Sequence, residues 1–225
     1  MGKYSKKGTY AGYDRNNKER QAEDYYATPP KEVYNILNII KLPFDKNTVI
    51  LDPGCGGGHL IEGILSYSEQ PFIIGTDIKE REITAEGTVD VLFWGDFFFG
   101  KEYDFLSEDY DSHFPLGVDY VIMNPPFSCI IPFTNHALSL ATKGVLMLGR
   151  LEFLESKKRY EEVFSIYPPT DIYVYVDRIA CYKNGDFSEK PSSIQAYAWY
   201  YWNKENKNNE TRCHWIRRYD NNIKV

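Results

Sequence analysis

The sequence lacks any apolar run long enough to cross a membrane, for which a helix needs about 20 consecutive apolar residues. Its polar start, MGKYSKKGTYAGYDRNNKER, also lacks the apolar segment of a secretory signal. These absences argue against a membrane span and an export signal in this stretch of chain. We therefore expect a soluble, intracellular protein with no membrane partner.

Cysteines are few, and none are paired at the CxxC spacing that zinc sites and redox pairs use. The four are Cys55, Cys129, Cys181 and Cys213. We expect them to be reduced thiols, and we expect no metal site.

The chain has too little positive charge for a uniformly basic nucleic-acid binder, because its net charge is −6. That charge is unevenly placed: residues 1–22 carry six Lys and Arg against two acids, and residues 204–225 carry six against three. A basic segment can reach phosphates while the body stays acidic. The sequence thus predicts two basic tails, 1–22 and 204–225, around one domain at 23–203.

Apolar periodicity divides the body into alternating strands and helices with short connections. Strands are expected at 48–52, 72–78, 89–98, 119–124, 144–151, 171–178 and 194–202, and helices at 31–40, 59–68, 133–143 and 153–164. This alternation is typical of an α/β fold with a parallel sheet covered by helices on both faces. No helix-length segment separates the last two strands, so we expect the last of seven strands to run antiparallel.

A glycine-rich turn, DPGCGGG at 52–58, lies where a strand becomes a helix and lets a ligand approach the backbone closely. It lacks the Lys-Ser/Thr ending of a triphosphate-binding loop, which disfavours ATP hydrolysis. Asp77 ends the next expected strand, from which a carboxylate can bind ribose hydroxyls. Asp96 and Phe97 follow a third strand, where an acid can bind an exocyclic amine and a ring can pack on a purine. These strand ends predict an adenosine ligand.

A fourth strand end carries NPPF at 124–127. The Asn124 side-chain carbonyl and the Pro125 backbone carbonyl can accept the two hydrogens of a planar amine, and that geometry favours its pyramidal, nucleophilic form. Pro126 restricts the conformation of residue 125 and so helps to fix its carbonyl. Phe127 supplies a ring on which a flat base can stack.

With these motifs the chain resembles the class I methyltransferases that use S-adenosylmethionine, and within them the N6-adenine DNA methyltransferases. NPPF matches the family's (D/N/S)PP(Y/F/W) tetrapeptide, and DYYATPP at 24–30 resembles its element that closes over the methionine end of the cofactor. The motif order is that of the gamma group, and the compact length resembles small phage or prophage enzymes. The resemblance implies the catalytic residues Asn124, Pro125, Pro126 and Phe127, and the cofactor-binding residues Tyr26, Thr28, Asp52, Pro53, Gly54, Cys55, Gly56, Gly58, Asp77, Ile78, Asp96, Phe97 and Asn124.

The resemblance further implies a Rossmann-like catalytic domain at 23–203 that moves a methyl group from S-adenosyl-L-methionine to the N6 amine of a flipped adenine in DNA, by direct in-line displacement. The chain has no length for a separate target recognition domain, so the implied partner is duplex DNA with a short recognition site. The implied setting is restriction-modification, in the cytoplasm of a bacterial or phage-infected host cell.

Two other substrates share the planar nitrogen: adenine in RNA, methylated at N6, and a protein glutamine, methylated at N5. A third alternative is an inactive module that only binds S-adenosylmethionine, although the intact glycines and NPPF argue against it. The sequence leaves the oligomeric state open. It also leaves open whether Lys31, His59, Arg150, Arg178 and Ser193 contact ligands or only pack and pair at the surface.

Overall fold

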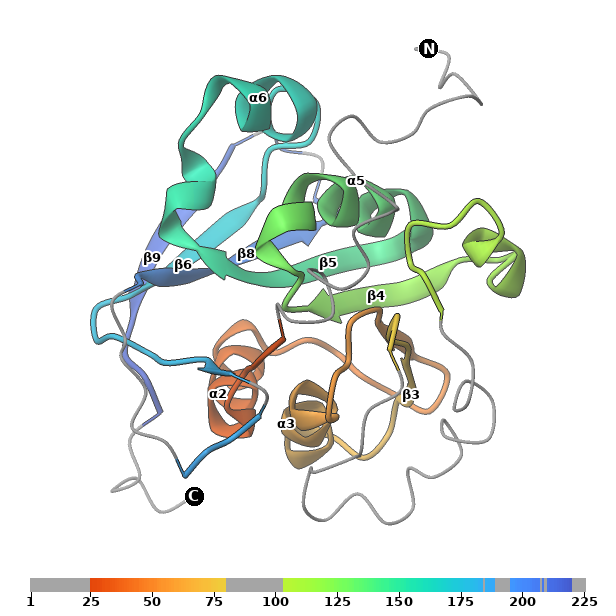
Figure 1. Ribbon diagram of the computed structural model, residues 1–225, viewed down its shortest axis with the longest axis horizontal. Coiled ribbons are helices and arrows are strands. Elements are labelled where there is room, and N and C mark those ends of the chain that lie inside the picture. The colour runs from red at the N-terminus through yellow and green to blue at the C-terminus, as the bar shows by residue number, and fades with distance from the viewer. Residues whose placement is uncertain are drawn as a thin grey trace.

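The computed structural model describes residues 25–79, 103–183, 185–188, 195–206, 208 and 210–219. The strands are β1 Tyr26–Ala27, β2 Val49–Asp52, β3 Phe72–Gly75, β4 Val118–Met123, β5 Ala141–Arg150, β6 Asp171–Tyr175, β7 Tyr182–Lys183, β8 Tyr197–Asn203 and β9 Arg212–Ile216. The α-helices are α2 Pro30–Ile40, α3 His59–Tyr67, α5 Ile130–Leu140 and α6 Lys157–Arg159. Figure 1 shows three layers, with α2 and α3 on one face of a sheet and α5 and α6 on the other.

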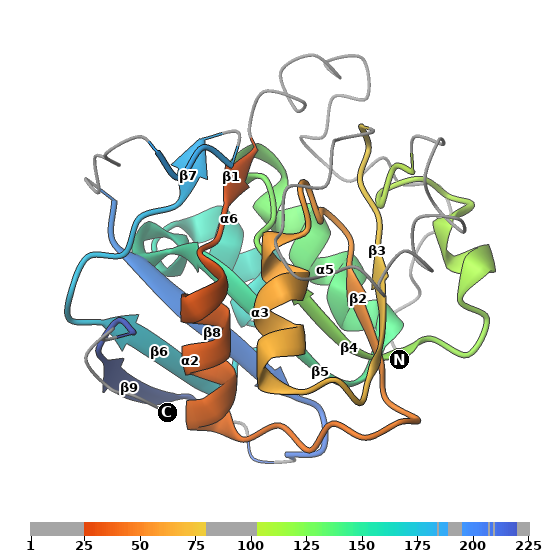
Figure 2. The ribbon, with the colours of Figure 1, turned by 90° about the horizontal axis from the view of Figure 1, so that it is seen from below.

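The predicted α/β fold with one reversed strand is confirmed. Seven strands form a sheet in the order β3-β2-β4-β5-β8-β6-β9. Only β8 runs antiparallel to its neighbours in this sheet of described residues, and the remaining pairs are parallel. Figure 2 shows the strands behind α2 and α3. Because β8 lies between two strands and both sheet faces are covered, each of its residues from Tyr197 to Trp202 is buried.

The reversed strand is not the last one, which corrects the prediction. β9 follows it and pairs in parallel with β6 at the edge of the sheet. The buried carboxylate of Asp171 on β6 lies 2.9 Å from Arg212 Nε and 2.8 Å from His214 Nε2. The polar, partly charged sequence RCHWI has a weak strand pattern, and these contacts from a distant part of the chain compensate for it.

The expected C-terminal tail is therefore partly built into the domain. Beyond β9, the backbone N–H of Tyr219 donates to the Glu32 carboxylate on α2 at 3.1 Å, and Asn35 Nδ2 donates to the Arg217 carbonyl at 2.9 Å. Burial raises the pKa of Glu32, while these donors and nearby Arg218 partly offset the rise. The expected tail at 1–22 and the expected strand at 89–98 lie outside the described residues.

The prediction of one continuous helix at 153–164 is wrong. Its place is taken by a 3₁₀ turn at Leu151–Leu154, the three-residue α6 and a π-helical turn at Tyr160–Phe164. Ser156 interrupts the segment because its φ of 141° is far from helical values. Arg159 Nη1 donates instead to the carbonyls of Glu152 and Glu155.

The other helices agree with their expected ranges to within a few residues. α2 begins with Pro30 at its first position, and Val33, Ile36 and Leu37 are fully buried against the sheet. Within the described ranges, no helix combines the length and apolar character that a membrane crossing requires.

Candidate functional site

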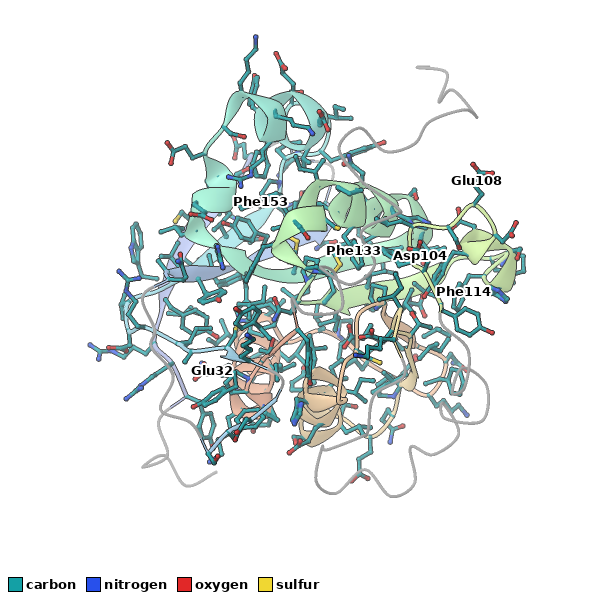
Figure 3. The ribbon with its side chains drawn as sticks, viewed as in Figure 1. Glu32, Asp104, Glu108, Phe114, Phe133 and Phe153 are labelled. Atoms are coloured by element: carbon teal, nitrogen blue, oxygen red, sulfur yellow. The ribbon has the colours of Figure 1, made fainter. Side chains whose placement is uncertain are left out.

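A pocket opens where the carboxyl ends of β2, β3 and β4 meet the segment that contains β1. It contains about 770 Å³ of empty space, including volume open to solvent. Its lining comprises Tyr25, Tyr26, Ala27, Thr28, Asp52, Pro53, Gly54, Cys55, His59, Leu60, Asp77, Ile78, Tyr103, Asp104, Phe105, Asn124, Pro126, Cys129 and Phe133. Figure 3 labels two of these, Phe133 on α5 and Asp104 before β4.

The glycine loop is covered by Tyr25. Gly56 has a φ of +54°, and a Cβ at this position would meet the Tyr25 ring at 2.1 Å, so only glycine fits. The N–H of Gly57 donates to the Tyr25 hydroxyl at 2.8 Å, and the N–H of Gly56 donates to Asp77 Oδ2 at 2.9 Å. The loop is thus held between Tyr25, just before β1, and Asp77, which follows β3.

Asp52 ends β2 at the base of the pocket and is 1% exposed. Burial raises the pKa of its carboxyl to about 8; the Gly54 N–H lowers it, and the charge of Asp77 raises it. The Gly54 donor lies 3.4 Å from Oδ1, which makes it a long hydrogen bond. Burial disfavours the charged form of Asp52, and the Gly54 N–H offsets this only in part. A cation bound in the pocket would therefore stabilise the carboxylate.

The N-terminal segment over the pocket is fixed by β1, which pairs in antiparallel fashion with β7. Thr28 follows β1 and is 2% exposed, and its Oγ1 has no hydrogen-bond partner among the described residues. Buried hydroxyl groups are rarely left without a hydrogen-bond partner. Since Thr28 lines the pocket, a polar ligand group there would satisfy it.

Asn124 lies directly after β4, and its Nδ2 donates to the backbone carbonyl of Tyr26 at 2.8 Å. A carbonyl can only accept, so the atom facing it must be the amide nitrogen, which settles the orientation of the side chain. Asn124 Oδ1 is therefore the atom left to accept a hydrogen bond from a ligand. β1 thus orients the side-chain carbonyl of the NPPF motif.

The rest of NPPF forms a short turn beside the pocket. The N–H of Cys129 donates to the Pro126 carbonyl at 3.0 Å. The Phe127 ring stacks against a planar group, since the guanidinium carbon of Arg150 lies 3.7 Å from its centroid. The rings of Tyr26 and Tyr197 lie 5.9 and 6.3 Å away, measured between centroids. Phe127 therefore belongs to an aromatic and cationic cluster.

The structure brings most of the predicted site residues together. Tyr26, Thr28, Asp52, Pro53, Gly54, Cys55, Asp77, Ile78, Asn124 and Pro126 line the pocket. Gly56 and Gly58 shape its loop with positive φ angles, whereas Pro125 and Phe127 lie beside the lining. Asp96 and Phe97 are outside the described residues.

The segment at 103–105 was not identified as part of the site from the sequence, although it lines the pocket. The backbone N–H of Tyr103 donates to the Asp77 carbonyl at 3.1 Å, so Asp104 is placed beside the end of β3. Phe105 is 1% exposed and packs 5.0 Å from the Phe133 ring. Asp104-Phe105 repeats the Asp-Phe pair at 96–97, and this repetition was the available signal.

The remaining candidates divide between the pocket and the surface. His59 is buried in the pocket wall, with Nδ1 3.2 Å from the Tyr25 hydroxyl, and burial lowers its pKa. Lys31 and Arg178 are exposed and do not line the pocket, and Ser193 is outside the described residues. Among the residues that the structure describes, no group of three His, Cys, Asp or Glu is arranged to hold a metal.

The chain has the Rossmann-like fold found in methyltransferases. No protein-family model matches the sequence, and no curated protein sequence matches it. Among solved structures it is similar to the methyltransferase subunit of a type I restriction-modification system from Streptococcus thermophilus, with a TM-score of 0.64 and 14% identity over 85% of this chain and 47% of that one.

Two further structures share the fold. One is a modification subunit of a putative type I restriction enzyme from Vibrio vulnificus, with a TM-score of 0.54 and 12% identity over 93% of this chain and 51% of that one. The other is a predicted O-methyltransferase from Agrobacterium tumefaciens, with a TM-score of 0.51 and 15% identity over 84% of this chain and 86% of that one. The chain therefore spans about half the length of the two restriction-modification proteins.

Proposed function

We propose that the protein transfers a methyl group from S-adenosyl-L-methionine to the N6 amine of adenine in DNA. The observation that carries this proposal is the orientation of Asn124, whose amide nitrogen is engaged by the Tyr26 carbonyl 2.8 Å away. Its oxygen is thereby presented as an acceptor at the edge of the pocket. An amine acceptor fixed beside a cofactor pocket is what transfer to a planar nitrogen requires.

The pocket residues fit this cofactor. The unsatisfied Thr28 hydroxyl can bind its carboxylate, and the buried Asp52 can hold its positively charged methionine end. A Cβ at Gly54 would meet only the Phe133 ring, at 3.9 Å, so the loop leaves space for a ligand. Asp77 is placed for the ribose hydroxyls. When bound, S-adenosylmethionine supplies an electrophilic methyl group on a positively charged sulfur.

Asp104 is the acid that we propose for the adenine amine of the cofactor. Asp104 lines the pocket, where Ile78, Phe105 and Phe133 provide apolar walls, whereas Asp96 lies outside the described residues. Its Oδ1 accepts from the Leu106 N–H at 3.0 Å, which fixes the carboxylate in place. A fixed carboxylate among apolar walls can bind an exocyclic amine and exclude bases that lack one.

The residues of NPPF then act by positioning. Asn124 Oδ1 and the Pro125 carbonyl accept the two amine hydrogens of the target base, which favours its pyramidal form. Phe127 offers a stacking surface, as its contact with the flat guanidinium of Arg150 illustrates. The amine becomes acidic as it is methylated, so its proton can pass to water and no strong base is needed in the site.

The test is methyl transfer from labelled S-adenosylmethionine to separate pools of duplex DNA, single-stranded DNA, RNA and protein, followed by digestion. We expect label in N6-methyladenine from DNA. The two restriction-modification subunits of similar fold favour DNA over the alternatives. Label only in RNA or only in glutamine would replace the proposed substrate, and cofactor binding with no transfer to any pool would support the inactive module.

Changing Asp104 to Asn is expected to weaken S-adenosylmethionine binding about 10- to 100-fold, since hydrogen bonds to charged groups contribute about 1.5–3 kcal/mol. Isothermal titration calorimetry measures the affinity. Glu108→Gln is the matched control, because it removes one charge from the same segment at an exposed position that does not line the pocket (Figure 3). Equal affinities for the two variants would remove Asp104 from the cofactor site.

A further inference from the structure

A second concavity lies on the outer side of Phe127, between the beginning of α5 and α6. It contains about 670 Å³ of empty space, including volume open to solvent. Its lining comprises Phe127, Ser128, Ile130, Ile131, Pro132, Ser156, Lys158 and Arg159, and we name it the Phe127 groove. Both helices lie on the same face of the sheet in Figure 1.

The lining of the Phe127 groove is positively charged. Lys158 and Arg159 contribute to it, and none of the described Asp or Glu residues does. Arg159 is held in place, since its Nη1 donates to the Glu155 carbonyl at 2.7 Å. Lys158 is exposed and pairs with Glu162 at 4.0 Å on the helix surface, an ion pair that water weakens strongly. The groove can therefore attract an anion.

The same groove carries the ring that we assign to the target base. Phe127 contributes to its lining and follows Asn124 by three residues. In a nucleic acid a sugar joins each base to its phosphates, so a base held at Phe127 brings its own phosphates within reach of this lining. Proteins that bind single-stranded nucleic acid commonly carry aromatic rings and cations along one groove, so that bases stack on the rings and phosphates meet the cations.

We propose that the Phe127 groove binds the phosphodiester backbone of the strand that carries the target base, with Lys158 contacting a phosphate; this rests on the proposed function. Tyr160, next to Arg159 in the chain, is 62% exposed and offers a further ring beside the cations. Aromatic rings next to cations favour a nucleic-acid strand over an acidic peptide, because bases stack and acidic side chains do not.

Lys157 provides a matched control for Lys158. Both belong to α6 and both pair with a glutamate four residues later, at 3.7 Å for Lys157 and 4.0 Å for Lys158. Only Lys158 lines the groove. Charge reversal at either position changes the net charge equally, so any difference between the variants reports the groove and not the overall field of the protein.

The experiment measures binding of fluorescent single-stranded DNA and RNA oligonucleotides by anisotropy as a function of salt, for the full chain and for the Lys158→Glu and Lys157→Glu variants. We expect Lys158→Glu to reduce the magnitude of the slope of log K against log salt by about 0.7, the contribution of one phosphate contact on a single strand. The ratio of the unchanged chain's affinity to that of Lys158→Glu should therefore be about fivefold larger at about 0.1 M salt than at about 1 M salt. Lys157→Glu should retain most of the original slope.

Binding needs no turnover, so this result is separate from the methyl-transfer assay. Equal slopes for the two variants, or no binding of either oligonucleotide by the unchanged chain, would overturn the proposal that the Phe127 groove binds a nucleic-acid strand. Methyl transfer to DNA combined with equal slopes would leave the proposed function standing without the groove. Transfer only to glutamine, with a slope lost in Lys158→Glu alone, would retain the groove as a nucleic-acid surface and overturn the proposed function.

Discussion

Replacing Asn124 by Ala should lower the rate of methyl transfer about 10²- to 10³-fold, the usual effect of removing one fixed polar group from a transition state. Cofactor affinity should stay within about threefold, less than 1 kcal/mol, because the amide oxygen faces the target amine in our proposal. Single-turnover kinetics at saturating cofactor separates these two effects from each other.

The control for this change is Asn35→Ala. Asn35 Nδ2 also donates to a backbone carbonyl, that of Arg217, at 2.9 Å, but it lies on α2 outside the pocket. This variant should transfer methyl groups at the unchanged rate. An equal loss of cofactor affinity and of rate in Asn124→Ala would mean that Asn124 serves the cofactor and not the target base.

Replacing Asp52 by Asn should raise stability at neutral pH while weakening cofactor binding. The carboxyl has a pKa of about 8 when buried, against 3.8 for its ordinary value. Between these two values the folded protein binds a proton that the unfolded chain does not, so stability falls as pH rises through this window. The full penalty corresponds to at most about 6 kcal/mol above pH 8, and it is absent near pH 4.

Urea unfolding of both proteins from pH 4 to pH 9 tests this expectation. The gain in unfolding free energy for Asp52→Asn should grow with pH and then level off near pH 8. Asp45→Asn is a control of opposite sign, since hydrogen bonds from Thr48 and the Asn47 N–H lower the pKa of that exposed carboxyl. Its replacement should reduce stability at neutral pH. A pH-independent gain for Asp52→Asn would show that Asp52 is not held neutral by burial.

Local patterns were sufficient for much of the fold. The ranges 48–52 and 119–124 are short, mostly apolar runs that predict buried strands from sequence alone. They correspond to β2 and β4, with small changes at their ends. The reversal of β8 was also predictable, because the polar connection before it contains no helix-length segment that could form a crossover. β9 was not predictable, since its pairing depends on Asp171, 41 residues before Arg212.

The candidate site shows the same division. No local feature of the Asp-Phe pair at 104–105 assigns it to the pocket, and the backbone contact from Tyr103 to Asp77 is what places Asp104 there. The break at Ser156, which places Lys158 in the Phe127 groove, likewise could not be derived from a periodicity that favoured one continuous helix.

The sequence by itself determined which chemical groups are present: a glycine turn, acids after successive strands, and an amide followed by two prolines and a ring. Parallel strands bring such groups to one edge of a sheet, so their assembly also followed from local patterns. Only the tertiary structure decided how they point. The Asn124 amide is oriented by the Tyr26 carbonyl, 98 residues earlier in the chain, and a hydrogen bond over that separation exists only after folding.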